Sequence, residues 1–113
     1  SLSLGIADAV TVLAGSAATA DVAATLIANE VNVDYPGIVK RPASEVKDDS
    51  DLGMLTVTVD VPALPAAQIS EALKRGAQTA GNFIRSGKIA AAYLSLQKQT
   101  LVVENNLKKE SNE

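Results

Sequence analysis

The sequence contains no cysteine, no histidine and no tryptophan, and aromatic residues make up only 3% of it. Without cysteine, the chain has no disulfides, thiolate zinc sites or iron–sulfur ligation of its own. Without histidine, catalysis by a Ser-His-Asp triad and metal binding through imidazole are excluded. The chemistry that remains is that of carboxylates, hydroxyls, Lys, Arg and main-chain groups.

Long apolar runs and clustered basic residues are also missing. No run approaches the roughly 20 apolar residues of a membrane-spanning helix, and no signal-peptide pattern is present. We therefore expect no membrane partner and a cytoplasmic location. The net charge is −3 at pH 7, and the 10 Lys and Arg residues form no stripe. Because nucleic-acid binding needs clustered cations and stacking aromatics, we expect no nucleic-acid partner either.

What the sequence does contain is a large share of small and aliphatic residues. Hydrophobic residues occupy 47% of the 113 positions, so we expect one modest core of Ala, Val, Leu and Ile. Strand-like sequence follows soon after Ser1, which is not preceded by an initiator Met. These features predict a single domain over residues 1–104 that is a fragment of a larger protein. A charged, frayed tail is predicted over residues 105–113.

Hydrophobic periodicity and turn residues predict two helices and several strands. Ser16 or Thr19 can cap the first helix, and Gly87 is placed to end the second. Polar residues dominate between the first helix and the next strand, which predicts a long loop. The predicted order is a strand over 9–14, a helix to about Val31, a loop over 34–53, a strand over 54–61, a helix over about 66–86, and an antiparallel pair of strands over 89–96 and 101–104.

These elements favour an α+β fold, a two-layer sandwich with two helices packed on a mainly antiparallel sheet of about four strands. Val57 and Val59 alternate with Thr and Asp, which predicts a half-buried strand. Residues 90–95 show no clean alternation, which favours a strand that is buried on both faces. The second sheet face would then meet another copy, in a homodimer, or a missing N-terminal domain.

One pair of polar residues stands out in the first helix. Asp21 and Thr25 are four residues apart, so they share one helix face near its N-terminus. A carboxylate and a hydroxyl offer two oxygen ligands of the kind that Mg²⁺ with bound phosphate needs. A plainer interpretation also exists, because the helix dipole favours Asp in an early turn and Thr bonds to the carbonyl one turn before it. For the isolated chain we expect an empty site.

The same stretch carries a family resemblance. Residues 10–14 (Val-Thr-Val-Leu-Ala) and 16–25 (Ser-Ala-Ala-Thr-Ala-Asp-Val-Ala-Ala-Thr) resemble the C-terminal motif of the ApbE-type FAD:protein FMN transferases. In that family, an Ala-Asp pair with Thr four residues after the Asp holds the magnesium ion that engages the flavin dinucleotide pyrophosphate. The resemblance implies a metal site at Asp21 and Thr25, and cofactor binding by Thr19, Asp21 and Thr25.

Other segments resemble a different branch of this superfamily. Residues 40–43 (Lys-Arg-Pro-Ala), 50–53 (Ser-Asp-Leu-Gly) and 55–59 (Leu-Thr-Val-Thr-Val) are similar to largely uncharacterised ApbE-like proteins, a branch that includes the C-terminal part of 6-hydroxynicotinate reductases. The resemblance covers roughly residues 5–104. The transferases carry a His-bearing flavin motif upstream, whereas this chain has no His. The resemblance implies a flavin-related parent that uses FAD or FMN with Mg²⁺, and for the isolated chain we expect no cofactor and no activity.

Two other functions remain open from the sequence. Lys40 and Arg41 stand side by side and could bind a small anion, such as a pyridine carboxylate. Two basic residues before a proline are also ordinary surface. Alternatively, the chain is a structural domain whose sheet mediates oligomerisation.

Overall fold

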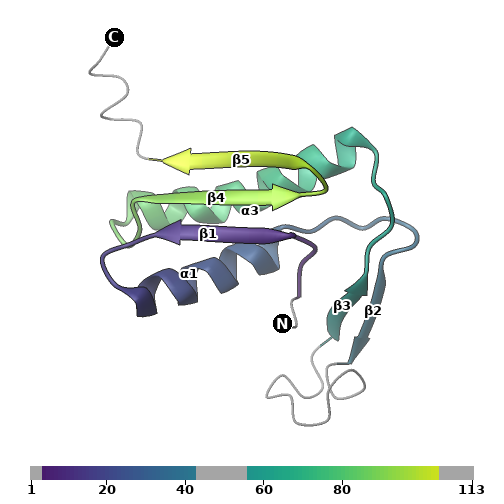
Figure 1. Ribbon diagram of the computed structural model, residues 1–113, viewed down its shortest axis with the longest axis horizontal. Coiled ribbons are helices and arrows are strands. Elements are labelled where there is room, and N and C mark those ends of the chain that lie inside the picture. The colour runs from purple at the N-terminus through teal and green to yellow at the C-terminus, as the bar shows by residue number, and fades with distance from the viewer. Residues whose placement is uncertain (1–3, 43–55, 105–113) are drawn as a thin grey trace.

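The computed structural model describes residues 4–42 and 56–104. In this part of the chain, a strand and a helix are followed by two strands, a second helix and two more strands (Figure 1). The prediction of an α+β fold is therefore confirmed. The elements are β1 (Ala9–Leu13), α1 (Ala17–Glu30), β2 (Val39–Pro42), β3 (Thr56–Asp60), α3 (Ala66–Arg85), β4 (Ala91–Leu96) and β5 (Gln99–Glu104).

The main sheet has three antiparallel strands in the order β1-β4-β5. Val10 of β1 is opposite Leu94 of β4, which is opposite Leu101 of β5. A two-residue turn joins β4 to β5, and its residues Gln97 and Lys98 have φ angles of 45° and 73°. Two positive φ angles are typical of a type I′ turn, whose twist suits a hairpin. The predicted antiparallel pair is thus confirmed.

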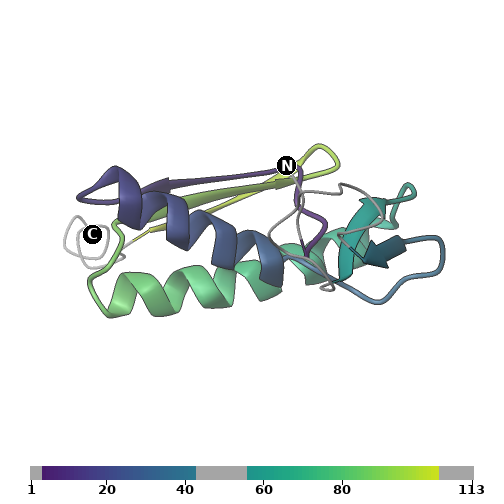
Figure 2. The same cartoon turned by 90° about the horizontal axis from the view of Figure 1, so that it is seen from below.

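Both helices lie on one face of the main sheet (Figure 2), with α1 against β1 and α3 against β4 and β5. The side chain of Ser16 caps α1, because its Oγ accepts a 3.1 Å hydrogen bond from the Thr19 N–H. The end of α3 is fixed by Gly87, whose φ of 79° lets the chain reverse. There the Lys88 N–H donates a 3.0 Å hydrogen bond to the Phe83 carbonyl. Local sequence signals therefore set the start of α1 and the end of α3.

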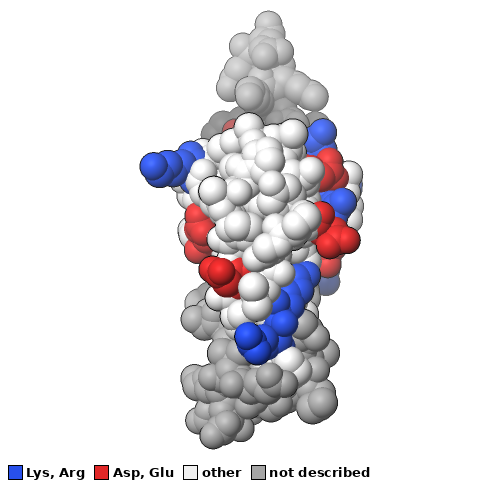
Figure 3. All heavy atoms as spheres, turned by 90° about the vertical axis from the view of Figure 1, so that its right-hand side faces the viewer, with Lys and Arg blue, Asp and Glu red and all other residues white. Residues whose placement is uncertain are grey.

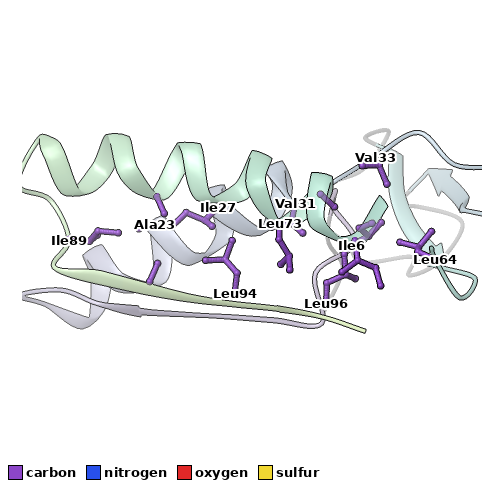
Figure 4. Close-up of a cluster of buried hydrophobic side chains, with 14 residues drawn as sticks. Ile6, Ala23, Ile27, Val31, Val33, Leu64, Leu73, Ile89, Leu94 and Leu96 are labelled. Carbon is purple, nitrogen blue, oxygen red and sulfur yellow. The ribbon is translucent and has the colours of Figure 1, made fainter. Parts of the chain in front are cut away.

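The core lies between the helices and the sheet (Figure 4). Ile27 and Val31 at the end of α1 meet Leu94 of β4, and all three are completely buried. Gly76 of α3 faces the same point, where an added Cβ would overlap Val31 Cγ2 and Leu94 Cδ2. The missing side chain therefore lets α3 approach α1 and β4 closely. The other buried members are Ile6, Ala23, Val33, Leu64, Ile69, Ala72, Leu73, Ala80, Ile89, Ala92 and Leu96.

β2 and β3 form a separate two-stranded antiparallel ribbon beside the sheet (Figure 1). The described strands therefore divide into three and two, where about four in one sheet were expected. The predicted loop over residues 34–53 is wrong at β2, because Val39–Pro42 pairs with β3. This pairing connects segments far apart in the sequence. Because Lys40 and Arg41 are polar, the local hydrophobic pattern does not reveal the strand to which they belong.

The central strand β4 is buried on one face only. Tyr93 is 42% exposed, whereas its neighbours Ala92 and Leu94 are buried. The predicted burial on both faces is wrong, because the helices cover one side of the sheet and small residues around Tyr93 disguise the alternation. The second face is therefore open to solvent in the described part of the chain.

In the ribbon, Val57 is buried as predicted, but Val59 is 40% exposed. The prediction of burial at Val59 is wrong, because among the described strands β3 pairs only with β2 in a separate two-stranded ribbon, which leaves more of its surface uncovered than a strand inside the main sheet. The first residues of the predicted strand, 54–55, lie outside the described residues, and so does the predicted tail over 105–113.

Candidate functional site

The outward face of α1 carries the two residues expected to bind a metal ion. Asp21 and Thr25 are both exposed and lie one turn apart, so the structure brings them together. The Thr25 hydroxyl donates a 3.0 Å hydrogen bond to the main-chain carbonyl of Asp21. Within residues 4–42 and 56–104, the Asp21 carboxylate has no hydrogen bond or ion pair. Its oxygens therefore face solvent and are free to accept a ligand.

Thr19, the third expected cofactor residue, is placed differently. Its hydroxyl accepts a 3.0 Å hydrogen bond from Ser16 Oγ and so belongs to the cap of α1. At 3.6 residues per turn, Thr19 points about 160° away from Asp21 around the helix axis. The three expected residues therefore divide into a close pair, Asp21 and Thr25, and a separate Thr19.

Asp21 and Thr25 fit only part of a magnesium ligand set. Mg²⁺ needs octahedral coordination by oxygen and usually keeps several waters. No group of three or more acidic side chains that could hold a metal exists among the described residues. The remaining ligands would be phosphate oxygens, water or residues that are not described. The pair can contribute to such a site but does not complete it.

Lys40 and Arg41, the expected anion-binding residues, are both exposed on β2. Because they are consecutive in a strand, their side chains point to opposite faces of the ribbon. Figure 3 views the molecule from the side of the ribbon and shows basic and acidic side chains scattered around an uncharged area. Because the two side chains leave opposite faces of the ribbon, they do not converge on one anion.

The helices border an apolar groove that the sequence did not predict. Its volume is about 390 Å³, and it is lined by residues of α1 and by Phe83 and Lys88 at the end of α3. Val22 and Leu26 of α1 line it while staying 59% and 45% exposed. Thr19 also lies on its wall. Thr19 therefore faces a groove rather than the Asp21–Thr25 pair.

A sequence signal for the groove did exist. Ile27 of α1 is fully buried, whereas the apolar Val22 and Leu26 of the same helix are exposed. Val22 and Leu26 form a second apolar stripe with the same four-residue spacing as Ala23 and Ile27. Only one of the two stripes can face the sheet, so the other must lie at the surface.

Neither α1 nor α3, the helices of the described part of the chain, is long and apolar enough to cross a membrane.

One protein family matches this chain over most of its length. Its model, described as "AbpE bacteria", matches residues 1–104. No curated protein and no solved structure matches the chain. The matched range includes the Asp21–Thr25 pair and the groove.

Proposed function

The chain belongs to the AbpE bacteria family, and from this we propose that it is a domain of a flavin-related, ApbE-like protein and is not catalytic by itself. The name of the family suggests the relation to ApbE-like proteins. The resemblance of residues 40–43, 50–53 and 55–59 supports a parent of the 6-hydroxynicotinate reductase type. We propose a cytoplasmic location for this parent. In this proposal the domain contributes to a flavin site and does not form one alone.

The observation that carries the proposal is the free carboxylate of Asp21 beside the Thr25 hydroxyl. Both groups are hard oxygen donors on an exposed helix face, which suits Mg²⁺ bound to a pyrophosphate. When bound, Mg²⁺ would neutralise the charge of the pyrophosphate of FAD. Asp21 would then supply a charged ligand, and Thr25 would supply a second oxygen whose direction is fixed by its bond to the main chain.

We expect the isolated chain to purify without flavin, because the ligand set is incomplete. Its Tm should rise when FAD and Mg²⁺ are added together at high concentration, since a ligand that binds only the native state stabilises it. At ten times Kd, the gain in the free energy of unfolding is about 1.4 kcal/mol, which raises the Tm of a domain of this size by several degrees. Thermal unfolding followed by circular dichroism measures it.

Asp21→Asn should remove the Mg²⁺-dependent rise and leave the Tm of the free protein unchanged, because Asp21 is exposed and unpaired within the described residues. Asp34→Asn, which changes an exposed carboxylate outside α1, is the matched control and should keep the rise. A rise of equal size in Asp21→Asn would contradict the proposal, as would no rise in the unaltered chain.

A structural role is the second candidate, and the open face of the main sheet favours it. Leu13, Tyr93 and Val102 lie on this face and are 65%, 42% and 58% exposed. Tyr93 is directly opposite Val102 in the register of β4 and β5, so their side chains adjoin. Such a face supports pairing with a second copy or with another domain. Small-anion binding at Lys40 and Arg41 has no comparable support.

A further inference from the structure

The groove between α1 and α3 has the composition of a small-molecule site. Its volume of about 390 Å³ lies within the range of ligand pockets, roughly 300–1,000 Å³. Most of its wall is apolar, and two side chains supply polar groups that can orient a ligand. The apolar residues are Ala18, Val22, Ala23, Leu26 and Phe83, and the polar ones are Thr19 and Lys88.

Lys88 gives the groove a positive charge. Its main-chain N–H donates a 3.0 Å hydrogen bond to the Phe83 carbonyl, so the turn at Gly87 fixes the main chain of Lys88 beside that of Phe83, and both residues line the groove. Among the described residues of the wall, Lys88 is the one with a charge. It forms no ion pair in the described part of the chain, so its ammonium group is available to an anion.

The N-terminus of α1 strengthens the same polarity. Thr19 lies in the first turn of α1, and this turn contains no acidic residue. The partial positive charge of the helix N-terminus is therefore not offset there by a side chain. Asp21 belongs to the face that holds Thr25 and does not line the groove. The groove thus combines an apolar wall with positive charge.

We propose that this groove binds a small amphiphilic anion, with an aromatic or aliphatic body against Val22, Leu26 and Phe83. Its carboxylate or sulfonate is bound by the Lys88 ammonium and the Thr19 hydroxyl. Apolar contact provides most of the affinity, and the charge selects anions over neutral molecules of the same shape. This binding needs neither Mg²⁺ nor Asp21, so it goes beyond the flavin-related role.

Two fluorescent probes test the proposal. 8-Anilinonaphthalene-1-sulfonate carries an aromatic body and a sulfonate, whereas N-phenyl-1-naphthylamine has the same body without the charge. We expect Lys88→Gln to weaken binding of the sulfonate about fivefold and to leave binding of the neutral probe unchanged. Lys74→Gln, which removes an exposed lysine of α3 that does not line the groove, should change neither.

A pair of valines locates the probe. Val22 in the groove and Val102 on the open sheet face are almost equally exposed, at 59% and 58%. Val22→Ser should weaken both probes about fivefold, and Val102→Ser should weaken neither. Equal effects of the two serine variants, or a sulfonate affinity that Lys88→Gln does not change, would overturn the proposal. So would no fluorescence enhancement in the unaltered chain. Because no Mg²⁺ is added, these results are independent of the flavin test.

Discussion

At the scale of single residues, two glycines of the same helix have opposite surroundings. At Gly76 an added methyl group would overlap Val31 and Leu94 in the core, whereas at Gly81 its nearest neighbour is the flexible end of Arg85, 3.3 Å away. Both positions are helical, so both gain from the higher helix propensity of alanine. Only Gly76 is needed for packing.

We therefore expect Gly76→Ala to lower the free energy of unfolding by about 1–3 kcal/mol, because overpacking outweighs the gain in helix propensity. Gly81→Ala should raise it by about 0.5–1 kcal/mol. Urea unfolding of both variants measures the difference. If Gly76→Ala were as stable as Gly81→Ala, α3 would not approach α1 and β4 as closely as described.

At the scale of elements, the β4–β5 hairpin is tied to the segment before α3 through Gln97. Its side chain accepts a 2.8 Å hydrogen bond from the Leu64 N–H and donates one of 2.7 Å to the Pro62 carbonyl. The Gln97 N–H donates to Asp8 Oδ2 at 2.7 Å. These bonds hold one of the two turn residues with positive φ. Lys98, the other, is exposed.

Lys98→Gly should raise the free energy of unfolding by about 0.5–1 kcal/mol. The left-handed conformation costs a non-glycine residue about 1–2 kcal/mol, and the greater freedom of glycine in the unfolded chain returns part of this. Lys74→Gly, at an exposed position inside α3, should lower stability by about 1 kcal/mol. Calorimetry of both variants measures these changes in stability. A Lys98→Gly variant that is less stable than the unaltered chain would contradict the assigned turn.

The elements also show how far the sequence predicts this fold. The start of α1 and the end of α3 depend on the local signals Ser16 and Gly87, and the β4–β5 hairpin on a short local turn, so these features were predictable. The ribbon was not, because β2 and β3 are separated by residues 43–55 and pair through main-chain bonds that any sequence can form. Local hydrophobicity does not encode a partner that lies so far along the chain.

At the scale of the whole molecule, one layer of helices leaves the other sheet face uncovered. If this face mediates self-association, Val102→Lys should weaken it at least tenfold, because a charge would be buried in an apolar contact. Val22→Lys places the same charge on the helix side of the molecule and should leave the self-association unchanged. Sedimentation velocity over a range of concentrations measures the association. A monomer at every concentration would contradict the structural role.

The candidate sites were also predictable from the sequence only in part. The four-residue spacing of Asp21 and Thr25 was enough to predict that they share a face of α1. The groove depends on how α1 and α3 pack and on where the turn at Gly87 directs Lys88, and neither follows from the spacing of residues. The sequence therefore placed Thr19 among the expected cofactor residues, whereas in the structure it lines the groove.

The most direct test of the flavin-related role is a titration of the isotope-labelled chain with FAD, with and without Mg²⁺, followed by amide NMR. We expect Mg²⁺-dependent shifts of amide signals around Asp21 and Thr25 in α1, and their loss in Asp21→Asn. Shifts that do not depend on Mg²⁺, that lie elsewhere in the molecule, or that persist in Asp21→Asn would contradict it.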